Sequence, residues 1–337
     1  TRSAPSEMAE EQRAEVPVTI VSGFLGAGKS TLVRRILTEE HGLRVLVVEN
    51  EIGEEVGIEN VLVTEGVDKE AVADFIEMPN GCICCSVKDE LTDALSKVVR
   101  SGRGFDLVVI ETSGLADPGP VASLFWIDEE LDLGLKLDGI ICLVDAVNAK
   151  RHFCDNIFVK QLALADLVLV NKIDLVDESS LVSLESEIQK LAPIARRKRT
   201  SMSECDLREA LNLHTLRENA LPLALSSGCD IQDHRHTEGV GSVTIRFGLN
   251  TAFDEKLLER QLGLLIWEQP AGEVWRLKAL VSVSPSRARW VYQGVHDLFE
   301  GNASGSWGDE HPRSSFIFIG KHLDRSCLEE HLNVATI

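Results

Sequence analysis

Positive charge and long apolar segments are scarce in this sequence. Only 34 Lys and Arg residues stand against 54 Asp and Glu residues, so the formal net charge is −20 at pH 7. This balance argues against sequence-independent binding to nucleic acid or to anionic membranes, because both are negatively charged. No apolar run approaches the roughly 20 residues of a membrane-spanning helix, and the first residues contain no signal-peptide core. We therefore expect a soluble, cytoplasmic protein, with an organelle or the nucleus left open as its compartment.

The cysteines do not form the pattern of a disulfide framework. Eight cysteines in 337 residues rich in apolar side chains are unlike a small secreted scaffold. Cys142 lies in the apolar run 139–144, which predicts a place in the core. The other isolated cysteines are Cys154, Cys205 and Cys327. Reduced, intracellular thiols are the simplest interpretation.

Neither an internal repeat nor a coiled-coil heptad is present, and composition divides the chain instead. Residues 1–16 are polar and acidic, which predicts a flexible tail. Residues 17–224 alternate short β-branched runs with amphipathic stretches, which predicts a P-loop NTPase-like α/β domain with a doubly wound, mostly parallel sheet. Residues 225–240 are crowded with Ser, Gly, Asp and His and predict a linker. Residues 241–334 predict a smaller α+β domain with a largely antiparallel sheet.

Hydrophobic periodicity predicts the individual elements of both domains. In the first domain, strands are expected at 18–22, 45–49, 107–111, 139–145 and 167–171, with helices at 29–40, 87–100, 160–165 and 179–191. In the second, a β-α-β-β-β-α order is expected, with strands at 243–247, 274–284, 289–296 and 315–319 and helices at 254–267 and from about 324.

A phosphate-binding loop fits G-x-x-x-x-G-K-[ST] in full, after an apolar strand and before a helix. In such a loop the glycines let backbone N–H groups approach phosphate oxygens. Lys29 is then expected to reach the terminal phosphates, and the Ser30 hydroxyl to bind Mg²⁺. The predicted nucleotide contacts are Gly23, Phe24, Leu25, Gly26, Ala27, Gly28, Lys29, Ser30 and Thr31.

The base is predicted to be guanine. Asn171, Lys172 and Asp174 form an N-K-x-D element at the end of an apolar strand, and the Asp174 carboxylate can accept hydrogen bonds from guanine N1 and N2. As a tetrapeptide alone the match is weak, but its position after a strand and a P-loop makes it specific.

Two acidic segments are expected near the phosphates. Glu111 ends a strand where nucleotidases carry an acid near magnesium, and Gly114 follows as a residue that can sense the γ-phosphate. The alternative for Glu111 is a surface acid that closes a strand. Glu51 and Gly53 follow the second strand as a switch segment, and a solvated acidic loop is the alternative there.

Three thiols lie within four residues, at Cys82, Cys84 and Cys85. Thiolates at this density favour zinc or copper(I) over hard cations. Three sulfurs leave a tetrahedral ion one ligand short, and no C-x-x-C partner pair occurs, which favours a site that hands its metal on. Glu49, Glu54, a water or a residue of a client protein are candidates for the fourth ligand. A redox dithiol and an inert core segment are the alternatives.

Two further polar clusters have simpler explanations. Cys229, His234 and His236 could bind metal, but a polar linker often contains histidines. The basic run 196–199 could suggest a nuclear signal or an RNA contact, yet a solvated loop near the nucleotide is the favoured interpretation in so acidic a chain.

Taken together, the motifs resemble CobW-type metallochaperone GTPases, which include the zinc-regulated GTPase metalloprotein activators. The segments that carry the resemblance are 23–30, 49–54, 80–86, 111–118 and 171–174, followed by 293–296, 307–309 and 318–320 in the second domain. The resemblance implies a slow GTPase that binds GTP, Mg²⁺ and Zn²⁺ and delivers zinc to a client metalloenzyme. It also implies that Lys29, Glu111 and Gly114 serve hydrolysis.

Three functions are weighed from the residues and the resemblance. The first is GTP-driven zinc delivery, with no nucleic acid or membrane partner and with a nucleotide- or metal-dependent homodimer as one possible assembly. The second is a zinc sensor or buffer whose GTP serves only as a conformational latch. The third is an ATP-dependent P-loop kinase.

Overall fold

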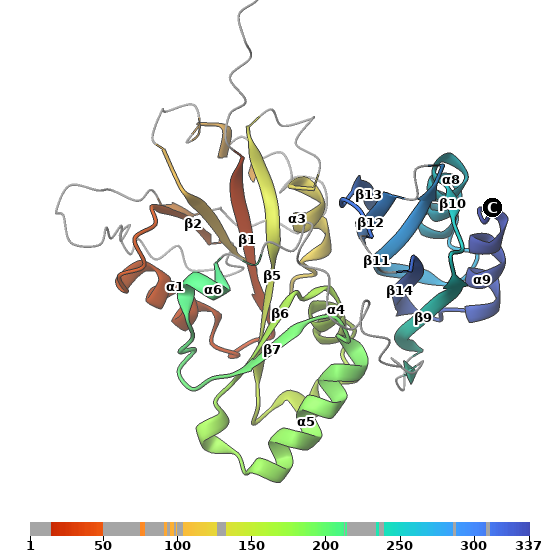
Figure 1. The fold of residues 1–337 in the computed structure, drawn as a ribbon. Helices are drawn as coiled ribbons and strands as arrows, with labels where there is room; N and C mark the ends of the chain where they lie inside the picture. The colour runs from red at the N-terminus through yellow and green to blue at the C-terminus, as the bar shows by residue number, and fades with distance from the viewer. Residues whose placement is uncertain are drawn as a thin grey trace, which may run out of the picture.

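The chain forms two sheets, each with its own helices, and the computed structural model describes most of both (Figure 1). The described residues are 15–49, 75–77, 91–92, 95–97, 99, 104–126, 133–211, 213, 234–235, 239–285, 288–307 and 311–337. Within them, no helix is long and apolar enough to cross a membrane.

The first sheet is parallel throughout the strands described. Its order is β3-β2-β4-β1-β5-β6-β7. The strands are β1 (Val16–Gly23), β2 (Val45–Glu49), β3 (Phe75–Glu77), β4 (Leu107–Glu111), β5 (Leu135–Asp145), β6 (Leu167–Asn171) and β7 (Arg196–Arg199). Each neighbouring pair runs in the same direction. The predicted doubly wound fold is therefore confirmed, and all seven carboxyl ends meet at one edge.

Helices cover both faces of this sheet. They are α1 (Lys29–Thr38), α3 (Gly119–Leu124), α4 (Asn156–Leu164), α5 (Glu178–Leu191) and α6 (Leu207–Ala210), with single turns η2 (Ala149–Arg151) and η3 (Ile173–Leu175). In β1, Ile20 faces the core beneath α4 and α5, whereas Val21 faces the core beneath α1 and α6. Strands buried on both faces need continuous apolar runs, and β4 and β6 contain them.

Cys142 on β5 is fully buried, as its apolar surroundings predicted. Burial raises the pKa of its thiol to about 12, with a small opposing effect from Lys29. The thiol therefore stays protonated and acts as a core side chain.

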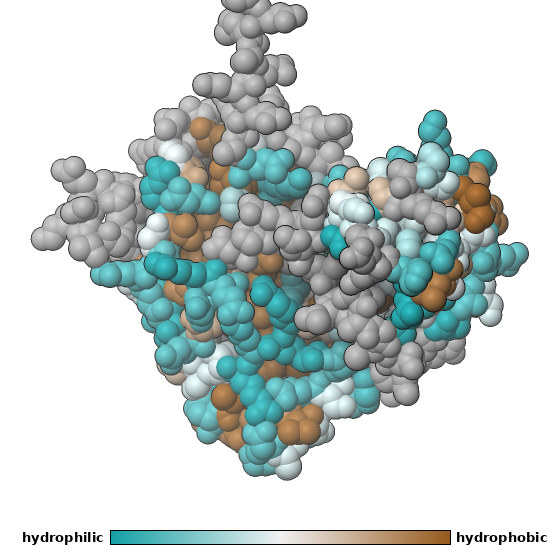
Figure 2. All heavy atoms as spheres, viewed as in Figure 1, coloured by the Kyte–Doolittle hydropathy of each residue, from teal (hydrophilic) through white to brown (hydrophobic). Residues whose placement is uncertain are grey.

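The basic run 196–199 corrects a prediction. It was expected to be a solvated loop, but it forms β7, the edge strand that pairs with β6. Lys198 and Arg196 pair with Glu209, while Arg199 pairs with Glu178 and with Glu185. Charged side chains protect an edge strand from association with other chains, which accounts for their presence in a strand. Figure 2 shows a mainly hydrophilic surface over β7 and α5.

Among the strands that the structure describes, the second sheet is antiparallel apart from one short strand. Its order is β13-β12-β11-β14-β9-β8, and β10 pairs in parallel with β11. The strands are β8 (His234–Arg235), β9 (Val240–Leu249), β10 (Phe253–Asp254), β11 (Glu273–Ser284), β12 (Ala288–Val295), β13 (Leu298–Ala303) and β14 (Arg313–Lys321). Helices α8 (Glu255–Gly263) and α9 (Arg325–Val334) pack together on it. The predicted α+β domain with a largely antiparallel sheet is confirmed.

Several details of this domain differ from the prediction, among them the short strand β10, which was not expected. The helix expected to reach residue 267 is α-helical only to Gly263 and continues as a π-helical turn, η4 (Leu264–Glu268). Strand β13 was not expected, because only its first two residues are large and apolar and none of its residues is fully buried. Strand β8 lies within the segment expected to be a linker and pairs with β9.

The second domain packs against the first through α4 and α5. Trp275, Ile317 and Ile319 from the second sheet belong to the same buried cluster as α4 and α5. Beneath this apolar contact, Asp166 accepts hydrogen bonds from Arg276 and from Lys278, and all three side chains are buried. A face of the second sheet thus completes the core of the first domain.

Burial and charge act in opposite directions on the pKa values of this group. Burial alone would raise the pKa of Asp166, but Arg276 and Lys278 lower it overall. The pKa of Lys278 is lowered to about 8, mainly because the buried ammonium loses its hydration. Repulsion from Arg276 lowers it further, and attraction to Asp166 only partly opposes these two effects.

Candidate nucleotide site

The phosphate loop connects β1 to α1 at the carboxyl edge of the first sheet. Gly28 stands at the start of α1 with φ 107° and ψ 21°, a left-handed conformation that favours glycine. A Cβ atom at Gly28 would lie 2.4 Å from Asn171 Nδ2, so a side chain is excluded by space as well. The free N–H groups at the start of α1 then face the loop, which is the geometry that binds phosphate.

Lys29 folds back over this loop. Its Nζ atom donates to the Gly23 carbonyl at 2.9 Å and lies 3.4 Å from the Phe24 carbonyl. Burial lowers the pKa of Lys29, while the Glu111 carboxylate acts in the opposite direction. The ammonium group is therefore held at the loop itself, where a terminal phosphate would bring compensating negative charge.

Ser30 and Glu111, the two residues expected near magnesium, lie side by side. The Ser30 hydroxyl on α1 donates to Glu111 Oε1 at 3.0 Å, although the two residues are 81 positions apart. Glu111 ends β4 and is only 8% exposed, so the alternative of a surface acid closing a strand is wrong. A hydroxyl beside a carboxylate supplies the hard oxygen ligands that Mg²⁺ prefers, so the donor set fits this ion.

The turn after β4 lies against the phosphate loop. Thr112 N–H donates to the Val21 carbonyl at 2.9 Å, which places the turn beside β1. A Cβ atom at Gly114 would lie 2.8 Å from the Leu25 backbone nitrogen. This backbone-to-backbone approach requires glycine and sets Gly114 at the loop where a γ-phosphate would be expected.

The N-K-x-D element follows β6, but its three polar residues do different things. Asn171 is buried and ties the phosphate loop to the segment after β7: its Nδ2 donates to the Ala27 carbonyl at 2.9 Å, and its Oδ1 accepts from Ser203 N–H at 2.9 Å. Asn171 thus fixes the phosphate loop relative to this segment, and its predicted contact with guanine stays a prediction. Asp174 is exposed and accepts from the Ser201 hydroxyl at 2.5 Å, which orients its carboxylate.

Lys172 is held by a residue that the sequence analysis did not single out. Its Nζ lies 2.8 Å from Oδ2 of Asp145, which ends the neighbouring strand β5. Burial would raise the pKa of Asp145, but hydrogen bonds from Lys172, Asn148 and the Val147 N–H lower it overall. The sequence did contain a signal for this ion pair, because Asp145 is an acidic residue at the end of the predicted strand 139–145. Ser201 and Ser203 had no such signal, because nothing local distinguishes them from other loop serines.

Aromatic rings join the phosphate loop to α4. The Phe24 ring is 4.3 Å from the His152 ring and 6.0 Å from the Phe158 ring, centroid to centroid. Phe24 thus has a packing partner outside the loop in addition to any phosphate contact of its backbone.

The predicted thiol site falls outside the described residues. These positions are Cys82, Cys84 and Cys85, together with Glu51, Gly53, Glu54, Cys229 and His236. Glu49 ends β2 in register with Glu111 on β4, so its backbone lies at the nucleotide edge. Only the backbone of His234 is described, in β8. In the part of the chain that the structure describes, no three His, Cys, Asp or Glu side chains gather as a metal site.

The fold and these contacts define a P-loop nucleotide-binding protein in which the N-K-x-D element after β6 contacts the phosphate loop. The nucleotide-binding domain of the CobW/HypB/UreG family matches residues 17–198, and the C-terminal domain of the cobalamin synthesis protein cobW matches residues 241–336. The chain belongs to the CobW family, which confirms the resemblance inferred from its motifs.

Relatives match over nearly the full length. The zinc chaperone YjiA of Escherichia coli is 34% identical, with 91% of this chain and 95% of that protein covered. Zinc-regulated GTPase metalloprotein activator 1 of Schizosaccharomyces pombe is 30% identical over 92% of this chain and 83% of that protein. The crystal structure of the Zn(II)-bound YjiA GTPase superposes with a TM-score of 0.74 and 28% identity, covering 95% of this chain and 99% of that chain.

Proposed function

We propose that this chain is a zinc chaperone that binds and hydrolyses GTP and delivers zinc to a client metalloprotein. The binding of GTP is supported by the pairing of Ser30 with the buried Glu111. It is also supported by the exposed Asp174, which follows β6 at the same edge of the sheet. The zinc half is supported by the thiols at 82, 84 and 85 and by relatives named as zinc chaperones.

In the proposed reaction, water attacks the γ-phosphorus of GTP, and the bond from this phosphorus to the β–γ bridging oxygen breaks. The products are GDP and inorganic phosphate. Lys29 and the N–H groups at the start of α1 stabilise the charge on the phosphate oxygens. Ser30 and Glu111 would hold Mg²⁺, which would supply positive charge to the phosphate oxygens. Gly114 responds to the γ-phosphate, and the Asp174 carboxylate accepts from guanine N1 and N2.

Zinc is the cargo of this cycle, and its predicted cysteine ligands come shortly after β3 in the sequence. Cys82 comes five residues after Glu77, the last residue of β3. Because β3 is parallel to β2 and β4, the chain leaves it at the edge where Glu49 and Glu111 end their strands. This proximity along the chain supports a coupling in which the state of the nucleotide changes the affinity of the thiols for zinc. Such coupling is reciprocal, so zinc must change GTP affinity by the same factor.

The proposal includes a division of the chain. The GTPase domain comprises residues 17–224 and the C-terminal domain residues 241–334. Residues 225–240 connect the two and contribute β8 to the second sheet, and residues 1–16 precede the first domain as a tail. The fourth zinc ligand is Glu49, Glu54, a water or a residue of the client, and the client receives the zinc. Assembly into a homodimer would depend on nucleotide or metal.

The test is zinc release measured with a colorimetric chelator. Zinc-loaded protein is mixed with the chelator in the presence of Mg²⁺ and either GTP, a nonhydrolysable GTP analogue, or GDP. A chaperone is expected to release zinc at rates that differ between GTP and GDP. Release that is the same with all three nucleotides contradicts GTP-driven delivery. Release that responds equally to GTP and to its nonhydrolysable analogue supports the latched sensor or buffer instead.

Variants locate the cargo site. Cys84→Ala is expected to lose stoichiometric zinc binding in an anaerobic titration, because two thiolates remain. Cys154→Ala is the matched control, since Cys154 is an exposed, unbridged cysteine of the first domain. Equal zinc affinity in both variants would move the site away from the thiol triplet.

A further inference from the structure

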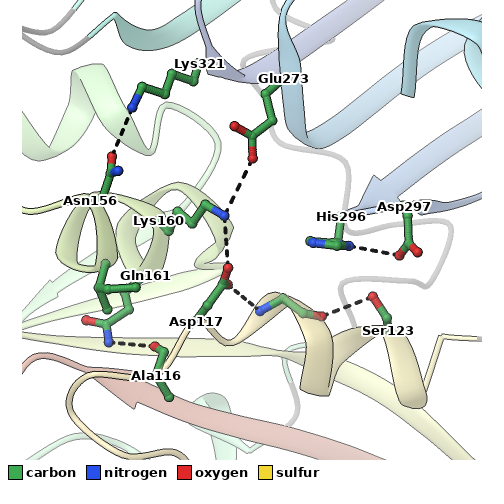
Figure 3. A network of polar contacts seen from close by, with 12 residues as sticks. Ala116, Asp117, Ser123, Asn156, Lys160, Gln161, Glu273, His296, Asp297 and Lys321 are labelled. Atoms are coloured by element: carbon green, nitrogen blue, oxygen red, sulfur yellow. Dashed lines mark hydrogen bonds and ion pairs between the residues drawn. The ribbon is translucent and has the colours of Figure 1, made fainter. Parts of the chain in front are cut away.

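Gln161 on α4 is a buried polar side chain that the reaction described above does not use. It is 0% exposed and lies in the middle of a helix whose other inward residues are apolar. Its Nε2 atom donates to two carbonyls of the turn after β4, Gly114 O at 3.2 Å and Ala116 O at 3.0 Å. Figure 3 shows the carboxamide directed toward Ala116.

Both hydrogens of this amide are therefore committed to one turn. A primary amide has two donors, and here each has a carbonyl acceptor within the same three residues. The turn is also closed on itself, because Ala116 N–H donates to the Ser113 carbonyl at 3.1 Å and Leu115 N–H donates to Ser113 Oγ at 3.3 Å. The peptide group between Gly114 and Leu115 is thus held on both sides, its carbonyl by Gln161 and its N–H by Ser113.

The opposite side of the turn faces the phosphate loop. The Gly114 backbone approaches Leu25 so closely that a Cβ atom would lie 2.8 Å from its backbone nitrogen. The turn therefore lies between Leu25 of the phosphate loop and Gln161 of α4. Helix α4 is itself packed against the loop through Phe158 and Phe24. A fixed amide behind the turn determines how the Gly114 peptides are presented to the loop in front of it.

We propose that Gln161 is a positioning residue for the γ-phosphate: its amide holds the Gly114 turn so that GTP, and not GDP, gains a contact from it. This inference rests on the proposed GTPase function. GDP carries no γ-phosphate, so its affinity depends on the phosphate loop and the base-recognition residues, which Gln161 does not contact in the interactions described. A defect in the amide should consequently appear as a loss of discrimination between GTP and GDP.

The experiment compares the affinities of GDP and a nonhydrolysable GTP analogue, both with fluorescent labels, in the full chain with Mg²⁺. Gln161→Met keeps the length of the side chain and removes both donors. We expect the affinity for the GTP analogue to fall about tenfold, the range expected when buried carbonyls lose their donor. GDP affinity should change less than about twofold, and kcat for hydrolysis should fall with the GTP affinity. In Gln161→Glu, a carboxylate would face the same two carbonyls, so its loss of GTP affinity should be at least as large.

Gln189→Met is the matched control. Gln189 lies on α5, where its amide donates to the Pro193 carbonyl at 3.2 Å, away from the nucleotide edge. It should leave the ratio of the two affinities unchanged. The inference is overturned if the ratio of the two affinities is unchanged in Gln161→Met. This result would follow from an equal loss of GTP and GDP affinity, which indicates a general structural defect, or from no loss of either. If the parent chain itself shows no preference for guanine nucleotides, the proposed function fails rather than the role of Gln161.

Discussion

Lys160 and Asp117 form an ion pair of 3.1 Å between α4 and the end of the turn after β4. The same ammonium lies 3.6 Å from Glu273 of the second domain and 5.2 Å from the centre of the Trp275 ring. Figure 3 shows Lys160 between the two carboxylates. A single side chain thus joins the segment expected to respond to the γ-phosphate with the C-terminal domain.

Lys160→Met should therefore reduce stability modestly. The Lys160 and Asp117 side chains are each about one-fifth exposed, so we expect a loss of about 1 kcal/mol in the free energy of unfolding, the upper end for a partly screened pair. Urea denaturation followed by circular dichroism measures it. Lys190→Met is the control, because Lys190 pairs with Glu187 within α5 and should cost less than about 0.5 kcal/mol. Equal losses in the two variants would show that the pair between the turn and the second domain has no special weight.

The Asp166 group predicts an alkaline pH dependence. Lys278 has a pKa of about 8 in the fold, below its ordinary 10.5. Both the folded and unfolded states hold its proton below pH 8, so the cost of burying the charge is fully present there. That cost is relieved as pH rises from about 8 toward 10.5, and stability from this group rises with it. Lys278→Met should flatten this part of the stability profile measured by urea unfolding.

Asp166 acts in the same direction at the acid end, because stability from this carboxylate also rises with pH. Its pKa is lowered by Arg276 and Lys278, so its contribution is present above the ordinary pKa of 3.8 and is lost as pH falls through the lower folded value. The Lys278 prediction would be contradicted if the stability profile of Lys278→Met ran parallel to that of the parent chain between pH 8 and 10.5.

Gly28 should be intolerant of even a methyl group. Its φ of 107° disfavours a side chain, and the new Cβ atom would lie 2.4 Å from Asn171 Nδ2, the atom that ties the N-K-x-D element to the phosphate loop. Gly28→Ala is expected to abolish measurable nucleotide binding by isothermal titration calorimetry.

Gly42→Ala separates backbone strain from this contact. Gly42 also has a positive φ, 76°, but a Cβ atom there would meet nothing within 4 Å. It should cost about 1 kcal/mol of stability and leave nucleotide affinity unchanged. If both variants bind nucleotide normally, the close approach at Gly28 has no functional importance.

Asp174 should determine the choice of base. Asp174→Asn replaces one acceptor oxygen with a donor that opposes guanine N1–H, so GTP affinity should fall at least about tenfold and the preference over ATP should shrink. Competition between labelled GTP and unlabelled ATP measures the preference. Asp177→Asn is a suitable control, because Asp177 caps α5 by accepting from Ser180 N–H and has no part in the proposed base site. Retained guanine selectivity in Asp174→Asn would reject the G-protein-like assignment.

Several strands were predictable because their patterns are local. Residues 45–49, 107–111 and 167–171 are continuous apolar runs, and they form β2, β4 and β6 with the expected bounds. The phosphate loop and N-K-x-D were recognisable for the same reason, since each depends on residues adjacent in sequence. Strands β7 and β13 lacked this signal, because edge strands face solvent on at least one side and tolerate charged or polar side chains.

Local spacing and periodicity were enough to establish the parallel sheet, the phosphate loop, the predicted thiol triplet and the membership of a GTPase-like class. Tertiary packing alone established that Asn171 ties Ala27 to Ser203, that Gln161 holds Gly114, and that Asp166 is buried against the second domain. Each of these contacts joins residues 32 to 144 positions apart. Patterns within one helix or strand report which face is buried, but the partner that a polar side chain meets there depends on how the whole chain returns to the site.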